Sequence, residues 1–302
     1  MRILINGLPY FSERIAKNLS DCNERHSFRF LDTYNSKWAK LEFALRIGQS
    51  DGMISMNGVS DQSGSLDLVM RKHRKIWMQW QGTDVLLALN RAKDGTIYRK
   101  YIDNARHFCD APWLIDELKT IGIQAELIHY KWLPKLENKS HFHQLAVYSY
   151  VAKGKENFYG WKSIEQCALN HPEITFYIVG TDGVDLINIP SNVEFRGWVN
   201  HTEMKMLQSE TPIFIRLTEH DGFSLSVLEA LAHGSEVIWN YPHPMVNYCS
   251  NETVATVFDQ LLERLKKNGL QRSKENIVYI DNNFNKDFVM NRLIAKMEEV
   301  FG

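Results

Sequence analysis

The sequence predicts an α/β fold of two doubly wound domains, each a parallel sheet with helices on both faces. Apolar strand-like segments alternate with helical segments along almost all of the 302 residues. The alternation breaks once, at 130–143, where the stretch YKWLPKLENKSHFH is polar and has no regular period. A chain of this length also accommodates two domains of ordinary size. We therefore place a domain boundary between residues 138 and 139.

The first domain, residues 1–138, begins with MRILINGLPYF, which indicates a strand followed by a loop. Short apolar runs predict strands at 2–6, 28–31, 52–56, 75–80, 106–109 and 124–128. Stretches of helix-forming residues predict helices at 12–18, 36–46 and 114–120, and a further helix after Gly82.

The second domain, residues 139–284, repeats the same alternation. Its expected strands are 145–150, 174–179, 193–195, 213–216 and 236–240, and its expected helices include 159–169, 201–208 and 223–233. From Glu252 onward the chain is mostly helical, and we expect the helix at about 285–302 to be able to pack back on the first domain. Two doubly wound domains predict a ligand cleft at the carboxyl ends of their strands.

Composition points to a cytoplasmic protein. No apolar run approaches the roughly 18 residues that span a bilayer, the N-terminus lacks a signal-peptide core, and the four cysteines have no metal-like spacing. The net charge of −1 is uneven, since residues 1–138 hold 20 Lys and Arg against 16 Asp and Glu. The run Arg71–Lys75 is either a solvated helix end or a patch for an anionic membrane surface, such as the inner face of the membrane, or for a phosphate-bearing acceptor.

The most informative stretch is RLTEHDGFSLSVLEALAHG, residues 216–234. A buried strand precedes it and a helix follows Asp221-Gly222, an order that presents unpaired backbone N–H groups to an anion. The helix is apolar except for one stripe, Ser226, Glu229 and His233. That stripe is either the solvent-exposed side of a core helix or the wall of a cleft in which Glu229 holds a polyol.

Three further loops follow expected strands of the second domain. Lys153-Gly154-Lys155 suits a diphosphate or is an ordinary solvated loop. Gly180 follows the next strand, and Gly197-Trp198-Val199 follows the one after it, where Trp198 serves either as a platform for a nucleobase or as core packing. Such loops are where an open α/β sheet presents its site.

Together these loops and DGFSLSVLEALAHG resemble the C-terminal domain of family-4 retaining glycosyltransferases, which have the GT-B fold. The resemblance covers about 145–241, including the segment NVEFRGWV at 192–199. It implies a nucleotide-sugar site in which Glu229 holds the ribose hydroxyls and Asp221 lies near the sugar. The implied phosphate contacts are the backbone N–H groups of Gly222, Phe223 and Ser224.

The chain departs from the family pattern at several of these positions. Asp221 replaces the usual Glu, and Ser224 replaces a common Gly. The family's Gly-Arg after the first strand of this domain is absent, so either Lys153 or Lys155 takes the place of the basic phosphate clamp. Arg216 is a further phosphate ligand or the partner of a nearby carboxylate. The implied catalytic residues are Asp221, Glu229 and Lys155.

In the first domain, Gln79-Trp80-Gln81-Gly82-Thr83-Asp84 is similar to a loop that faces the cleft in many sugar transferases. The resemblance implies that Gln81, Gly82, Thr83 and Asp84 lie on the acceptor side, with Gly7 from the first loop. Gln79 stands where a His is expected. Thr83 or Asp84 is alternatively just an N-cap.

The function implied is a retaining, metal-independent glycosyltransferase that uses a nucleoside-diphosphate sugar, expected to be UDP-linked, and no cofactor. The expected acceptor is a glycan, a glycolipid or a polysaccharide precursor. A nucleotide-sugar epimerase or hydrolase, and a non-catalytic binding subunit, remain as alternatives. Near-neutral charge argues against nucleic-acid binding, and no metal-binding motif or P-loop is present.

Overall fold

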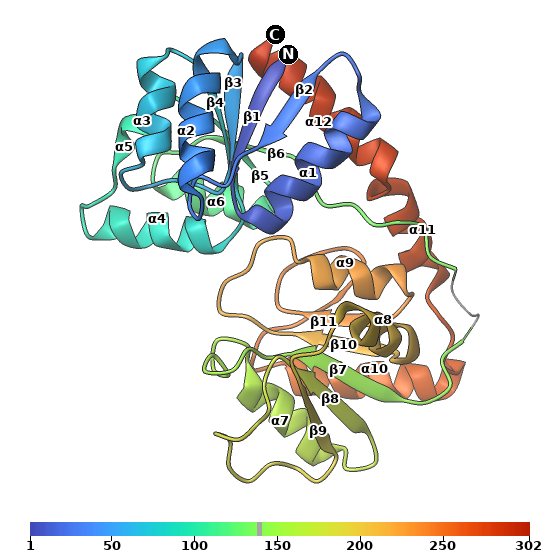
Figure 1. Ribbon diagram of the computed structural model, residues 1–302. Coiled ribbons are helices and arrows are strands. Elements are labelled where there is room, and N and C mark those ends of the chain that lie inside the picture. Colours follow the sequence, from blue (N-terminus) through green and yellow to red (C-terminus); the bar gives the residue numbers. More distant parts are fainter. Residues whose placement is uncertain (138–140) are drawn as a thin grey trace. The chain divides into compact units, whose positions relative to one another are not determined.

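A computed structural model describes residues 1–137 and 141–302 (Figure 1). Contacts divide this part of the chain into two compact units. Unit 1 contains Met1–Trp132, His220–Phe223 and Lys286–Gly302, and unit 2 contains Leu133–Glu219 and Ser224–Asn285. The predicted boundary between 138 and 139 falls on residues 138–140, which lie outside the described residues.

Each unit contains one parallel sheet, and within the described ranges each sheet has six strands. The order in unit 1 is β2-β1-β3-β4-β5-β6. Its strands are β1 (Arg2–Gly7), β2 (Ser27–Phe30), β3 (Gly52–Met56), β4 (Lys75–Trp80), β5 (Arg106–Cys109) and β6 (Ala125–Leu127). The order in unit 2 is β12-β11-β10-β7-β8-β9. Its strands are β7 (Ala146–Tyr150), β8 (Thr175–Val179), β9 (Val193–Gly197), β10 (Ile213–Arg216), β11 (Glu236–Trp239) and β12 (Asn247–Tyr248). The predicted doubly wound α/β architecture is confirmed.

Most helices lie between successive strands, whereas α10, α11 and α12 follow the last strand. Those of unit 1 are α1 (Pro9–Cys22), α2 (Lys37–Arg46), α3 (Gly64–Arg71), α4 (Thr83–Lys93), α5 (Arg99–Ile102), α6 (Pro112–Thr120) and α12 (Lys286–Phe301), with a 3₁₀ turn at Ile47–Gln49. Those of unit 2 are α7 (Trp161–Asn170), α8 (His201–Glu210), α9 (Leu225–Ala232), α10 (Val254–Asn268) and α11 (Lys274–Asn283).

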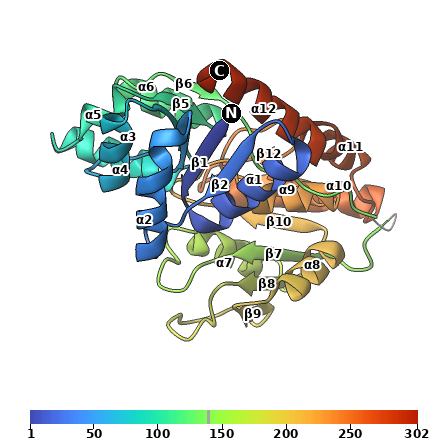
Figure 2. The same cartoon turned by 45° about the horizontal axis from the view of Figure 1, so that its top comes forward.

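The core of unit 1 brings both ends of its sequence together. Apolar side chains of β1, β3 and β4 pack against α1 and against α12, which is the last helix of the chain. Figure 2 shows α12 alongside α1, and residues of the two helices are in contact. Phe301 stacks on Trp77 of β4 with ring centroids 6.5 Å apart. The C-terminal helix is therefore part of unit 1.

The core of unit 2 lies between its sheet and helices α7 and α10. Val147, Ile178 and Ile215 of the sheet pack with Ile164 of α7 and Phe258 of α10. In the sheet order, β7 and β10 are neighbours although they are far apart in sequence. The order of connections reverses at this pair, and open α/β sheets bind ligands at such a switch point.

Candidate nucleotide-sugar site

Four loops gather at the carboxyl edge of the sheet in unit 2. The loops after β7 and β8 are joined because Lys153 N–H donates to the Gly180 carbonyl at 3.1 Å. The loop after β8 is joined to the carboxyl end of β9 because Gly180 N–H donates to the Gly197 carbonyl at 2.7 Å. The loops after β7 and β10 are joined because Glu219 N–H donates to the Phe158 carbonyl at 2.9 Å. The structure thus places the predicted loops next to one another.

The two lysines of the loop after β7 differ in their surroundings. The Lys153 ammonium lies 2.9 Å from Asp182 Oδ2, an exposed pair in which the Asp182 hydrogen bond and charge raise the pKa of Lys153. Lys155 is exposed, and within the described chain no carboxylate lies at ion-pair distance from it. Gly154 between them has a φ of 75°, a left-handed conformation that glycine adopts without strain. The two lysines thus differ in that Lys153 is paired with Asp182, whereas Lys155 has no such ion pair in the described ranges.

Gly180 allows the loop after β8 to come close to its neighbours. Its φ is 96°, and a Cβ there would lie 2.7 Å from the Tyr150 ring and from the Val151 carbonyl oxygen. Trp198, after β9, is 83% exposed, so the alternative in which it is core packing is wrong. Trp198 and Val199 instead line a cavity of about 450 Å³ beside α8. A ring this exposed can stack on a planar ligand.

The helix after Asp221-Gly222 begins later than predicted. Helix α9 starts at Leu225, with Ser224 as its N-cap residue, instead of at residue 223. The Ser224 hydroxyl does not cap the helix, but it lies 2.8 Å from the hydroxyl of Ser226. The stretch from Asp221 to Ser224 is consequently a loop that leads into the first turn of the helix.

Glu229 is half-buried on α9 and has a defined partner. Its Oε2 accepts a hydrogen bond of 2.9 Å from Nε2 of Gln208, which is buried on α8. Burial and the charge of Glu229 together raise the pKa of Tyr148, a buried residue of β7. One oxygen of the Glu229 carboxylate is thus bound by α8, and the carboxylate lies near enough to β7 to affect Tyr148.

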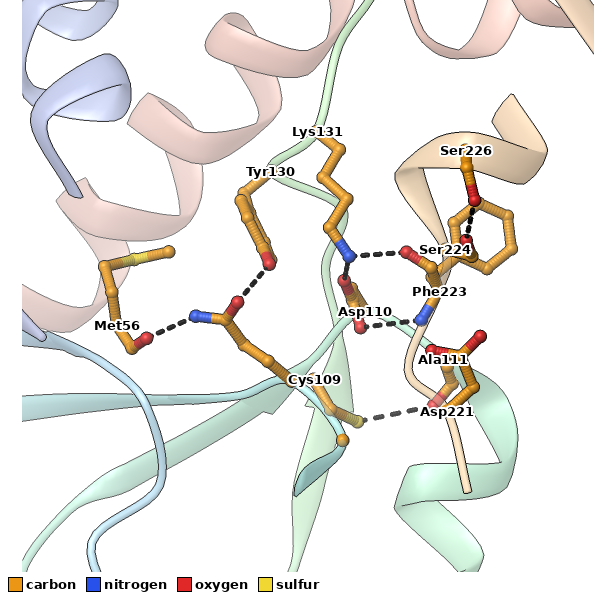
Figure 3. Close-up of polar contacts among 12 residues, drawn as sticks. Met56, Cys109, Asp110, Ala111, Tyr130, Lys131, Asp221, Phe223, Ser224 and Ser226 are labelled. Atoms are coloured by element: carbon orange, nitrogen blue, oxygen red, sulfur yellow. Dashed lines mark hydrogen bonds and ion pairs between the residues drawn. The ribbon is translucent and has the colours of Figure 1, made fainter. Parts of the chain in front are cut away.

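The segment His220–Phe223 belongs to unit 1, and Figure 3 shows the contacts of Phe223 with Asp110 and Lys131. The Phe223 N–H donates to Asp110 Oδ1 at 3.3 Å, and its carbonyl accepts from the Lys131 ammonium. The Asp221 carbonyl accepts from the Trp113 indole at 2.7 Å. A Cβ at Gly222 would overlap the carbonyl oxygen of Gln81, so glycine is required there. These contacts hold the backbone of the motif in place.

Other polar residues of this stretch also have partners. His220 Nε2 lies 2.8 Å from Glu117 Oε2, and the Arg216 guanidinium lies over the Tyr159 ring at 6.0 Å from its centroid.

Lys131 and Asp110 form a buried ion pair that sequence reasoning missed. Their charged atoms are 2.6 Å apart, and the side chains are 9% and 1% exposed. Burial raises the pKa of Asp110, and the charge of Lys131 opposes that effect. Lys131 belongs to the segment interpreted as a linker, and Asp110 follows β5 without any motif. Nothing in the local pattern indicates that the two meet.

The predicted acceptor-side residues surround a large cavity in unit 1. Its volume is about 1080 Å³, and Gly7, Gln81, Thr83 and Asp84 line it. Gly82 precedes Thr83 with a φ of 134° and is the N-cap residue of α4, so the alternative that Thr83 or Asp84 is the N-cap is wrong. Gln79 is 1% exposed within β4, where its Oε1 accepts from the Trp77 indole at 3.1 Å.

Asp84 holds the wall of this cavity together. Its carboxylate accepts hydrogen bonds from the backbone N–H groups of Gly58, Gln81 and Gly82, with lengths of 2.5, 2.9 and 2.9 Å. Burial raises the pKa of Asp84, while these backbone donors lower it. The loops after β3 and β4 are therefore joined through one buried side chain. This contact gives Asp84 a structural role in the pocket.

The basic run Arg71–Lys75 lies at the end of α3 and the start of β4. The Arg74 guanidinium donates to the Gly48 carbonyl at 2.5 Å. The Lys75 ammonium donates to the Gly302 carbonyl at 3.1 Å. Across the described ranges, no helix combines the length and apolarity needed to cross a bilayer. In the same ranges, no three His, Cys, Asp or Glu side chains gather as metal ligands would.

Solved structures with the same arrangement decide the fold. A glycosyltransferase from Rickettsia africae ESF-5 has a TM-score of 0.69 at 11% identity, covering 99% of this chain and 98% of its own. Sucrose-phosphate synthase from Thermosynechococcus elongatus has a TM-score of 0.67 at 11% identity, covering 100% and 99%. The chain has the GT-B fold. The resemblance noted from the sequence is thereby confirmed as a likeness to GT-B glycosyltransferases, though not to family 4 in particular.

A GT-B structure solved with ligands is also similar. The pneumococcal O-GlcNAc transferase GtfA, in complex with UDP and GlcNAc, has a TM-score of 0.58 at 12% identity over 82% of this chain. This chain spans only 56% of the length of GtfA. No protein-family model matches the sequence, and no curated protein matches it either. At these identities the likeness extends to the fold.

Proposed function

We propose that the protein is a retaining, metal-independent glycosyltransferase that uses a nucleoside-diphosphate sugar and no cofactor. One observation carries the proposal: the loops after β7, β8, β9 and β10 are hydrogen-bonded together at the switch point of unit 2, with Lys155 among them. A lysine and glycine-rich backbone at this edge suit a diphosphate. UDP is the expected nucleotide, since GtfA was solved with UDP.

In this proposal Glu229 binds the ribose hydroxyls, and Gln208 keeps its carboxylate in position. Lys155 neutralises the diphosphate as negative charge develops on the leaving group. The backbone N–H groups of Gly222 and Ser224 face the phosphates, and that of Phe223 can join them only when its bond to Asp110 breaks. Asp221 contacts the sugar. Trp198 stacks on the base.

The acceptor occupies the cavity of about 1080 Å³ in unit 1. An acceptor hydroxyl attacks the anomeric carbon on the face from which the diphosphate leaves. The new bond joins the acceptor oxygen to that carbon, the bond from the carbon to the phosphate oxygen breaks, and the hydroxyl proton passes to the leaving diphosphate. No protein nucleophile is needed in this reaction. The acceptor class proposed is a glycan, a glycolipid or a polysaccharide precursor.

The variant Glu229→Ala tests the donor site. Losing hydrogen bonds to a charged group should lower kcat/KM by about 100-fold or more and weaken nucleotide binding by a similar factor. Thermal-shift screening with a panel of nucleotide sugars would first identify the donor, because a ligand stabilises the folded state that binds it. The matched control is Glu263→Ala on the exposed face of α10, which should behave as wild type. If Glu229→Ala transferred sugar at the wild-type rate, the assignment of Glu229 to the donor site would be wrong.

NMR of the reaction separates the alternatives. Retention of the anomeric configuration and unchanged rates in a chelator are expected. Consumption of the donor at full rate without acceptor would instead indicate a hydrolase or an epimerase. Binding of a nucleotide sugar without turnover would indicate a non-catalytic subunit.

A further inference from the structure

Helix α2 of unit 1 turns its large apolar side chains toward solvent. Trp38, Leu41 and Leu45 are 81%, 52% and 70% exposed. Their spacing of three and four residues places them in one row on the helix surface. The opposite face of the same helix supplies Phe43, 2% exposed, to the interior of unit 1. A surface helix ordinarily shows polar residues on its outer face, so the row formed by Trp38, Leu41 and Leu45 calls for a covering partner.

Positive charge borders this row. Lys37 flanks the row and is exposed, and no ion pair of its ammonium is found in the described part of the chain. The carboxylate on α2 is Glu42, which pairs with Arg29 at 2.6 Å and with Arg46 at 2.5 Å. The surface beside the apolar row is therefore cationic. The complementary partner is apolar at its centre and anionic at its boundary.

A lipid bilayer fits this surface better than a protein does. Tryptophan favours the interfacial layer of a membrane, and lysines beside it extend their ammonium groups to the lipid headgroups. Protein interfaces are depleted of lysine and need about 20–30 residues a side, whereas α2 has ten. We propose that α2 is a docking surface for anionic lipid bilayers, with Trp38, Leu41 and Leu45 entering the interfacial layer and Lys37 contacting the headgroups.

The position of α2 relates this surface to the large cavity. Lys40 and Phe43 line that cavity, together with Tyr34 from the loop before the helix. Lys40 and Phe43 lie on the side of α2 away from the row, so the helix separates a docked bilayer from the cavity. Docking at the row therefore does not rest on the proposed function.

The basic run Arg71–Lys75 is the other membrane surface that the sequence suggests. Arg74 and Lys75 already donate to carbonyl groups of unit 1, and the run contains no apolar side chain to insert. It can add attraction at long range, but binding that depends on insertion requires α2.

Vesicle co-sedimentation with the full chain tests the proposal. Wild-type protein should bind vesicles of phosphatidylcholine mixed with phosphatidylglycerol, and bind pure phosphatidylcholine more weakly. The triple variant Trp38→Ser, Leu41→Ser, Leu45→Ser should bind the mixed vesicles at least about 10-fold more weakly. The variant Lys37→Ala should bind mixed vesicles about 5-fold more weakly, with less effect at high salt.

Matched controls replace exposed apolar and basic residues elsewhere. The variant Leu169→Ser, Val184→Ser, Ile187→Ser removes side chains of unit 2 that are 54%, 76% and 81% exposed, and it should bind vesicles as wild type does. The variant Arg71→Ser, Lys72→Ser should retain most of the binding. Unchanged circular dichroism and denaturation midpoints would show that each variant is folded.

Three results would overturn the proposal. The first is wild-type protein that binds no anionic vesicle, and the second is a triple variant that binds as wild type does. The third is loss of binding in the Arg71, Lys72 variant alone, which would place the contact at the basic run. Self-association that the triple variant abolishes, measured by light scattering together with absent vesicle binding, would identify the row as a contact between copies of this chain.

Discussion

At the scale of single residues, the position of the Glu229 carboxylate depends on Gln208. The two side chains come from different helices, and the donor amide is 3% exposed. A buried amide donor constrains the carboxylate oxygen that it binds. Gln208 acts through Glu229, so we regard it as a positioning residue.

Replacing Gln208 with Met tests this role. The substitution keeps the size of the side chain and removes the donor, so the carboxylate should become less ordered. We expect nucleotide affinity to fall about 10-fold, the effect of one hydrogen bond to a charged group. Calorimetric titration measures it, and KM for the donor should rise more than kcat falls. Gln166→Met, on the exposed side of α7, serves as the control. If Gln208→Met and Gln166→Met bound the nucleotide equally well, Gln208 would have no positioning role in the site.

Sequence reasoning identified Glu229 but could not identify its partner. Glu229 is a polar residue on an otherwise apolar helix, which is visible from spacing alone. Gln208 is one of many polar residues in HTEMKMLQSE, and its burial depends on how α8 packs. The pair Lys131–Asp110 could not be predicted for the same reason. The two residues are 21 positions apart, and neither belongs to a motif.

At the scale of elements, the C-terminal end of α9 contains a buried histidine whose side chain titrates. His233 is the C-cap residue, and its carbonyl accepts from Arg272 Nη1 at 2.6 Å. Burial, with the charges of Arg272 and Lys205, lowers the pKa of His233 to about 4. Below its ordinary value of 6.5 the unfolded chain binds a proton that the folded chain does not. Stability should therefore be lost as the pH falls from 6.5 toward 4.

Urea denaturation measured near neutral pH and at about pH 5 checks this expectation. The free energy of unfolding should fall by about 1–2 kcal/mol on acidification through His233 alone. Burial also lowers the pKa of His243 to about 4, so His243 should add to the loss of stability on acidification. In His233→Gln the pH dependence should be smaller than in wild type. His201→Gln, at an exposed position on α8, should leave it unchanged. Identical pH profiles for wild type and His233→Gln would contradict the assignment.

At the scale of the whole molecule, the last helix completes the core of the unit that contains the first strand. Seven buried residues of α12 join the core of unit 1: Val289, Met290, Leu293, Ile294, Met297, Val300 and Phe301. Phe301 is 5% exposed, and its ring occupies the space above Gly52, where a Cβ would not fit beside it. Unit 1 thus depends on both ends of the described sequence.

Phe301→Ala should lower the free energy of unfolding of unit 1 by about 3–5 kcal/mol, because it opens a cavity against β4. Thermal and urea denaturation measure the change. Phe288→Ala removes a ring from the same helix at a position 38% exposed and should cost much less. Similar losses in the two variants would show that α12 does not complete this core.

The sequence by itself determined the alternation of strands and helices, the two doubly wound sheets and the loops at their carboxyl ends. These features follow from local patterns, since each strand and each helix start has its own signal over a few residues. The helix start at Leu225 instead of Phe223 shows the limit of such signals. Propensity favoured an earlier start, but the contacts of Phe223 with Asp110 and Lys131 keep that residue in a loop.

Only the tertiary structure decided which side of each element is buried and which distant residues meet. In KWAKLEFALR, Phe43 and the row of Trp38, Leu41 and Leu45 compete for the interior, and spacing alone favours the row of three. Packing buries Phe43 instead and leaves the row exposed. The partners of Glu229 and Lys131 were decided in the same way. Burial and long-range contacts depend on what surrounds an element, and the sequence of that element does not contain this information.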